Sequence, residues 1–220
     1  MLFDRERNLG PKQLSTTMSA SINSLVQRYG IINGDRVILY AGTFEPYQGL
    51  DLLVDASREV TSTLKDVRFL CAGGNEKQIS QTRSRAHGRG VAEYFIFPGV
   101  LPPEDIDDLL KIASVLVSPR TSGTNTPLKI YSYLRSGVPI LATNILSHTQ
   151  ILTDQVALLV EPVPQAVGSG ILRLLHDAQL CRHLSQNALR LAHASYSEDA
   201  YRRKVAEVFS FLADKSRRAD

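Results

Sequence analysis

The sequence predicts an α/β protein with a doubly wound parallel sheet, and three observations support this fold class. Short apolar segments alternate with amphipathic segments along most of the chain. The apolar segments are hydrophobic at successive positions, as in strands that helices cover on both faces. After the last of them the pattern is helical only, from about residue 164 to the end. In such a fold, ligands bind beyond the carboxyl ends of the strands.

Residues 1–35 are predicted to form a helical lead-in to the domain. This segment is polar until Leu25 and Val26, and its one helix is expected to end near Gly30, because glycine commonly follows the last turn of a helix. The domain itself is expected to span residues 36–220, without an internal repeat or a low-complexity linker.

Six strands are expected in this domain, at residues 37–41, 67–72, 94–97, 115–118, 138–142 and 156–160. The helices between them carry apolar residues at helical spacing, as Leu50, Leu53 and Val54 do after Gly49. Three further helices are expected to close the chain. The predicted architecture is therefore a six-stranded, Rossmann-like sheet with C-terminal helices.

The composition is that of a globular chain, and it disfavours a nucleic-acid partner. The chain has 220 residues, of which 43% are hydrophobic, and a net charge of only +3. No long basic run is interleaved with aromatic residues, as nucleic-acid binding would favour. The basic cluster Arg83, Arg85, His87 and Arg89 is interpreted as the solvated face of a helix.

The two cysteines and the hydropathy pattern indicate a location. Cys71 and Cys181 show neither the spacing of metal ligands nor a disulfide framework, so we expect a reducing compartment and no metal site. No basic-then-apolar leader begins the chain, and no apolar run approaches the roughly 18 residues needed to span a bilayer. We therefore expect a cytoplasmic protein without a transmembrane segment.

Small residues follow most of the predicted strands, at Gly42, Gly73, Gly99 and Ser118. Glycine at such exits permits positive φ and close approach of a ligand, although it also serves ordinary turns. The sequence lacks G-x-G-x-x-G after the first strand, G-x-x-x-x-G-K-[ST] and G-x-S-x-G. Dinucleotide-dependent dehydrogenases, P-loop NTPases and hydrolases with a nucleophile elbow are thereby disfavoured.

Histidine contributes little to the predicted cleft. His176, His183 and His193 are expected to face solvent. His148 follows the fifth predicted strand and is expected near the cleft, but helix capping by Ser147 with an exposed His148 beside it is the simpler interpretation.

The segment from Ser122 to Thr143 is the most informative part of the chain. It places a loop of small and hydroxyl residues before a short helix that opens with Pro127 and Lys129. Unpaired N–H groups and the helix dipole at such a start favour an anion such as phosphate. The alternative is that Thr124 or Asn125 simply caps the helix.

Four segments together carry a family resemblance. They are Gly42-Thr43-Phe44 with Gly49 to Ala56, Val67 to Gly73, Phe97-Pro98-Gly99-Val100, and Pro127-Leu128-Lys129-Ile130-Tyr131 with Gly137-Val138-Pro139-Ile140. The chain resembles the carboxyl-terminal, nucleotide-sugar-binding half of a GT-B glycosyltransferase, from the group called glycosyltransferase family 4 or group 1. The resemblance spans roughly residues 36–211.

The chain departs from this family at four positions. Ser132 and Thr124 stand where the family has a pair of glutamates that bracket the central loop, and Thr43 and Gln48 stand where it often has diphosphate-binding cations. A serine hydroxyl can still bond a ribose, without the charge of a carboxylate.

Two cations could compensate for the missing ones. Arg120 leaves the fourth strand at the same crevice, and Lys129 lies in the first turn of the following helix. The alternatives are an ion pair of Arg120 with Glu45 or Asp154, and a solvated Lys129.

The resemblance implies a set of nucleotide-sugar-binding residues and no catalytic residue. The set is Gly42, Thr43, Gly99, Val100, Arg120, Thr124, Asn125, Thr126, Lys129 and Ser132. The implied reaction is transfer of a sugar from a nucleotide-diphosphate sugar with retention of configuration, without a cofactor. An N-terminal acceptor domain or a partner chain would be needed for activity.

Two other functions remain open at this point. A non-catalytic remnant or regulatory module would bind no nucleotide and would hold a protein partner at the face that meets the other domain. A sugar-nucleotide epimerase would need acids and bases in the cleft, which the sequence places there sparsely.

Overall fold

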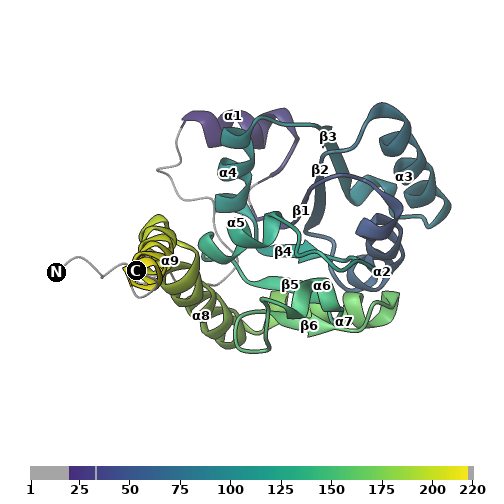
Figure 1. Cartoon of the computed structure of the whole chain (residues 1–220). Coiled ribbons are helices and arrows are strands. Elements are labelled where there is room, and N and C mark those ends of the chain that lie inside the picture. The colour runs from purple at the N-terminus through teal and green to yellow at the C-terminus, as the bar shows by residue number, and fades with distance from the viewer. Residues whose placement is uncertain (1–19, 33, 218–220) are drawn as a thin grey trace.

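The computed structural model describes residues 20–32 and 34–217 of the chain. Its centre is one six-stranded parallel sheet with the strand order β3-β2-β1-β4-β5-β6 (Figure 1). The strands are β1 (Arg36–Ala41), β2 (Val67–Ala72), β3 (Phe95–Gly99), β4 (Val115–Ser118), β5 (Ile140–Thr143) and β6 (Leu158–Val160). The predicted doubly wound α/β class is confirmed.

Helices cover both faces of this sheet (Figure 1). The bounds are α1 (Ala20–Arg28), α2 (Leu50–Thr63), α3 (Glu76–Gly88), α4 (Pro103–Ile112), α5 (Lys129–Arg135), α6 (Leu146–Thr149), α7 (Pro164–His176), α8 (Ala178–Tyr196) and α9 (Glu198–Arg217), with short 3₁₀ turns at Pro46–Gln48 and Ala92–Tyr94. Helices α2, α3 and α7 pack on one face, and α1, α4 and α5 on the other, while α8 contributes to both.

Successive strand residues point into two different cores, which explains the flat hydrophobicity of the strands. In β1, Ile38 and Tyr40 join the core under α2 and α7, whereas Val37 and Leu39 join the core under α4 and α5. Because side chains alternate across a strand, both sets must be apolar. Burial of each such side chain contributes roughly 1.5–3 kcal/mol.

The strand predictions are accurate to one or two residues. The chain enters β5 at Ile140 rather than Val138, because Pro139 has no N–H to donate to a ladder and only its carbonyl bonds Leu116. β6 begins at Leu158, since the N–H groups of Val156 and Ala157 both bond the Thr153 carbonyl in a turn.

The lead-in packs against the domain. Ile22 and Leu25 of α1 are buried in the same core as Leu109 of α4. The first 19 residues of the predicted lead-in lie outside the described residues, and the boundary at residue 35 stays a prediction.

The last three helices form as expected after residue 164. Cys71 in β2 and Cys181 in α8 are both buried free thiols. Among the described helices, none is long and apolar enough to cross a membrane.

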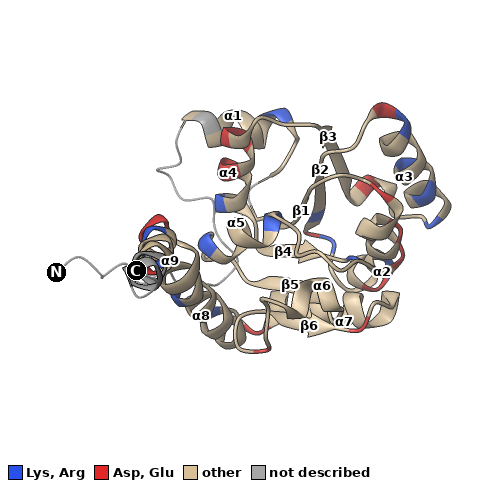
Figure 2. Ribbon diagram, viewed as in Figure 1, with Lys and Arg blue, Asp and Glu red and all other residues tan. Residues whose placement is uncertain are grey.

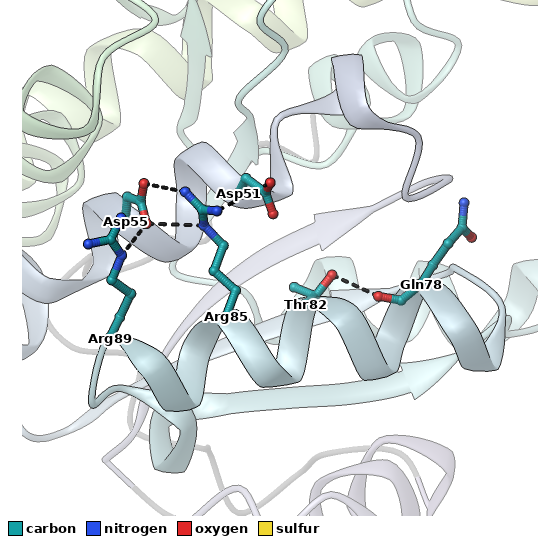
Figure 3. Close-up of polar contacts among 6 residues, drawn as sticks. All are labelled: Asp51, Asp55, Gln78, Thr82, Arg85 and Arg89. Atoms are coloured by element: carbon teal, nitrogen blue, oxygen red, sulfur yellow. Dashed lines mark hydrogen bonds and ion pairs between the residues drawn. The ribbon is translucent and has the colours of Figure 1, made fainter.

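The basic cluster on α3 is not simply a solvated face. Figure 2 shows its Lys and Arg positions beside the acidic positions of α2. In Figure 3, Asp55 of α2 accepts bonds from Arg85 (2.6 and 3.2 Å) and from Arg89 (2.8 Å). Asp51 lies 3.5 Å from Arg85. Arg83, His87 and Arg89 are exposed as predicted, and Arg85 is half-buried. The prediction did not include the ion pairs of Arg85 and Arg89 with α2.

Candidate functional site

Glycines let the backbones after β1, β2 and β4 touch at the carboxyl edge of the sheet. A Cβ on Gly49 would lie 1.8 Å from the Pro119 carbonyl oxygen, and one on Gly73 would lie 1.9 Å from the Gly42 oxygen. Both glycines have positive φ, 78° and 121°. Only glycine permits these approaches, and they bring three strand exits together.

Lys129 reaches from α5 to the exit of β1. Its Nζ lies 3.8 Å from the centroid of the Tyr40 ring and would lie 3.0 Å from a Cβ on Gly42. This nitrogen is buried, and no hydrogen-bond partner contacts it among the described residues. Burial, with the nearby charge of Arg120 as the second cause, lowers the pKa of Lys129 to about 7. The alternative of a solvated Lys129 is therefore wrong.

Two buried tyrosines fix the backbone around this lysine. Tyr40 donates its hydroxyl to the Thr43 carbonyl at 2.6 Å, and the Tyr133 hydroxyl accepts the N–H of Ala41 at 3.0 Å. Burial raises the pKa of both hydroxyls, so both stay neutral. The exit of β1 is thus held from two sides.

Arg120 is buried at the exit of β4, with 8% of its surface exposed. Its guanidinium lies 5.0 Å from the centroid of the Tyr47 ring and donates to the Asn125 carbonyl at 2.7 Å, while Nε has no partner among the described residues. No ion pair joins Arg120 to Glu45 or Asp154, all of which are described. Neither of these carboxylates therefore compensates the charge of Arg120.

The hydroxyl-rich loop is exposed, and the side chain of Gln150, directly after α6, bonds to it. Gln150 donates to the Thr124 carbonyl at 2.8 Å and accepts from the Thr126 hydroxyl at 2.9 Å. Asn125 is bound through its carbonyl to Arg120. Hydrogen bonds therefore hold the loop at Thr124, Asn125 and Thr126.

His148 is fully buried, so the predicted exposed histidine beside a capping Ser147 is wrong. Its Nδ1 lies 2.8 Å from the Thr143 carbonyl oxygen and its Nε2 lies 2.8 Å from the Ser118 hydroxyl. A carbonyl only accepts, so Nδ1 carries the proton and Nε2 accepts from Ser118. Thr143 in turn donates to the Arg120 carbonyl at 2.5 Å. This network holds the ends of β4 and β5 together and orients Arg120.

The other predicted residues lie at the same carboxyl edge of the sheet and differ in how far they are exposed. Gly99 follows at the edge strand β3, where its carbonyl accepts the N–H of Gly73 at 2.7 Å. Val100 is 80% exposed just beyond it. Ser132 is half-buried three residues after Lys129, hence on the same face of α5. The fold thus gathers the predicted set along one edge of the sheet, with Lys129 and Arg120 at the centre.

Sequence reasoning placed His148 near the cleft but missed its burial and its hydrogen bonds, and it did not select Tyr40, Tyr133 or Gln150. Tyr40 and Tyr133 looked like ordinary core residues of a strand and a helix, and nothing local distinguishes the hydroxyl that reaches another element. The polar Ser118 and Thr143 at two neighbouring strand ends were the available signal that a buried polar side chain must join them.

The arrangement is suited chemically to a multiply charged anion. Two buried cations meet backbone exits rich in glycine, and the described residues contain no cluster of three acids, histidines or cysteines fit for a metal ion. Charge-assisted bonds from such cations to phosphate oxygens are strong.

Comparison with known proteins gives a consistent result. The family model described as glycosyl transferases group 1 matches residues 21–191. A phosphatidyl-myo-inositol mannosyltransferase of Mycobacterium leprae is 25% identical over 185 residues, which cover 83% of this chain and 46% of that protein. The chain spans about half the length of the curated relatives that it matches.

Solved structures share the fold. HepE of Anabaena, solved in complex with UDP and glucose, has a TM-score of 0.76 at 18% identity, covering 88% of this chain and 53% of that one. The C-terminal domain of a group 1 glycosyltransferase from Francisella tularensis, LpcC, has a TM-score of 0.68 at 16% identity, covering 82% of this chain and 95% of that domain. The six-stranded sheet is thus the C-terminal-like part of a GT-B fold. With most of its length matched by the family model, this chain belongs to the group 1 glycosyltransferases.

Proposed function

We propose that this chain is the donor-binding half of a retaining glycosyltransferase and that it binds the diphosphate of a nucleotide-diphosphate sugar. The observation that carries the proposal is the pair of buried cations, Lys129 and Arg120, whose Nζ and Nε have no partner among the described residues. Buried charges without partners are costly and commonly mark a site that an anion completes. HepE, which shares the fold, was solved with UDP and glucose.

The proposed chemistry is stabilisation of a leaving group. As the bond between sugar and diphosphate breaks, negative charge grows on the diphosphate. Lys129, Arg120 and the N–H groups near Gly42 and Asn125 are positioned to stabilise that charge more strongly in the transition state. Activity then requires an acceptor site, which we assign to an N-terminal domain or partner chain, because the chain covers about half of each relative.

A titration of the purified chain with UDP, GDP and ADP by calorimetry tests the proposal. We expect one nucleotide to bind, and Lys129→Met to weaken it at least tenfold, since the variant keeps the length of the side chain but loses its charge. The matched control is Lys77→Met, which changes an exposed lysine in the first turn of α3. No binding at millimolar nucleotide by the folded chain would contradict the proposal and would favour a non-catalytic module, for which the absence of carboxylates at Thr124 and Ser132 also speaks.

A further inference from the structure

The surroundings of the Lys129 ammonium contain no compensating negative charge. The titratable or charged groups near it are Tyr40 of β1, Cys71 of β2, Arg120 after β4 and His148 of α6. Burial raises the pKa of Tyr40 and of Cys71, so both are neutral. In the described part of the chain, no carboxylate forms an ion pair or a hydrogen bond with Lys129 or Arg120.

The free site therefore disfavours a second positive charge. Protonation of Lys129 places a cation in a water-excluded position near Arg120, which is charged at all pH values relevant here. The face of the Tyr40 ring, 3.8 Å away, attracts the protonated form and offsets part of this cost. The balance lowers the pKa of Lys129 to about 7, so the amine changes charge near neutrality.

A bound diphosphate would reverse this balance. Its oxygens would supply the missing negative charge between the two cations and would favour the protonated amine by opposite-charge attraction. We propose that nucleotide diphosphate binding at this site is coupled to uptake of a proton by Lys129, so that this lysine sets the pH dependence of donor binding. The inference rests on the proposed function and adds to it a proton that enters with the ligand.

The coupling predicts a defined pH profile. Above pH 7 the free chain loses the Lys129 proton, so affinity falls by up to about tenfold per pH unit until the pKa of the complex is reached. Below about pH 6.5 Lys129 is already protonated and causes no further change in affinity. The terminal phosphate of the nucleotide itself titrates near pH 6. Between pH 7.5 and 8.5 the nucleotide is already ionised, so any proton taken up on binding is bound by the protein.

Calorimetry in buffers of different ionisation enthalpy measures the coupling directly. The nucleotide that binds is titrated at pH 8 in Tris and in HEPES, and the difference in heat gives the number of protons taken up. We expect close to one proton for the wild-type chain and for Lys77→Met, and none for Lys129→Met. A thermal unfolding curve for each variant checks that the fold is intact.

A second measurement follows the charge of the lysine itself in the free chain. In the free chain with lysines labelled at ¹³Cε, one NMR signal should titrate near pH 7 and should move to higher pH with nucleotide; its absence from Lys129→Met assigns it. Nucleotide binding without proton uptake at pH 8, or uptake that persists in Lys129→Met, would overturn the coupling and leave the proposed function intact. Absence of nucleotide binding would overturn both.

Discussion

Gly49 is the residue at which the loop after β1 meets the end of β4. Its φ is +78°, and an added Cβ would lie 1.8 Å from the Pro119 carbonyl oxygen, a rigid backbone atom. We expect Gly49→Ala to destabilise the fold by more than about 2 kcal/mol, because both the left-handed conformation and the contact must change.

Urea unfolding measures this effect, and Gly88→Ala provides the matched control. Gly88 ends α3 without positive φ, and nothing lies within 4 Å of its added Cβ. The control should be neutral or more stable by about 0.5–1 kcal/mol. Equal midpoints for Gly49→Ala and wild type would show that the loop moves away from Pro119 without cost.

His148 predicts a loss of stability in mild acid. Burial lowers its pKa from 6.5 to about 4, although the hydrogen bond to the Thr143 carbonyl acts in the opposite direction and raises it. Between these values the unfolded chain binds more protons than the folded one, so stability falls as the pH drops from about 6.5 to 4. His148→Gln removes this titration, and a plot of unfolding free energy against pH should be flatter for it.

His193→Gln is the matched control, because His193 is exposed on α8. Its plot should keep the wild-type slope between pH 4 and 6.5. If His148→Gln also kept that slope, the acid sensitivity of the chain would have to come from other groups.

The sequence was sufficient to select the two cations of the candidate site, but it did not predict that they are buried. Arg120 and Lys129 were selected because they follow a strand end and open a helix. Their burial depends on Tyr40, Tyr47 and the glycine exits, which are brought close only by the sheet. Charge type is local information, whereas desolvation is a property of the assembled fold.

At the scale of elements, α2 and α3 are joined by charges as well as by apolar packing. Partial burial of Asp55 raises its pKa, but hydrogen bonds from Arg85 and Arg89 outweigh this and leave the pKa lowered. A carboxylate with a lowered pKa contributes stability above about pH 4, and that stability is lost as the pH falls. The network therefore favours the native helix pair at neutral pH.

We expect Asp55→Asn to lower the free energy of unfolding by about 1 kcal/mol, with a smaller loss at high salt, because the arginines are partly exposed. Asp51→Asn, which changes an exposed carboxylate 3.5 Å from Arg85, should cost less than about 0.5 kcal/mol. Chemical denaturation at low and high salt compares the two. A salt-independent loss for Asp55→Asn would point to packing rather than charge.

The bounds of helices and strands were predictable wherever one hydrophobic pattern, that of a helix or of a buried strand, dominated the segment. The strands β2 and β4 have the predicted bounds, since all their residues except Arg68 and Ser118 enter one of the two cores. The bounds of β5 and β6 shifted because a proline and a turn compete with ladder bonding at their starts. The ion pairs of Arg85 and Arg89 were not predicted, because their partner Asp55 lies on α2, about thirty residues earlier.

At the scale of the whole molecule, α1 is part of the domain core although it precedes the first strand. Leu25 is 3% exposed in the core that it shares with α4. We expect Leu25→Ala to destabilise the entire chain by about 2–4 kcal/mol, with one cooperative transition.

The control for this prediction is Ser24→Ala, an exposed neighbour on the same helix. It should change stability by less than about 0.5 kcal/mol. Circular dichroism during urea unfolding reports both variants. A second, early transition in Leu25→Ala would mean that α1 opens separately and that a boundary at residue 35 describes the folding unit.

Topology was predicted more fully than the site because alternation of strands and helices leaves few arrangements of a parallel sheet. The strand order then places Gly42, Arg120 and Lys129 at the centre and Gly99 and Val100 at the edge. The hydrogen bonds of His148 across β4 and β5 could not be predicted in the same way, since they depend on side-chain directions that only the assembled sheet fixes.

The rates at which the two buried cysteines are modified report how often two parts of the fold open. A thiol reagent reacts only with the thiolate, which is the nucleophile. Burial raises the pKa of both thiols, so each cysteine can be modified only when its surroundings open. Cys71 lies in a central strand and Cys181 on α8 near the edge of the same core. The ratio of their modification rates in the native state separates detachment of the C-terminal helices from complete unfolding, without any introduced label.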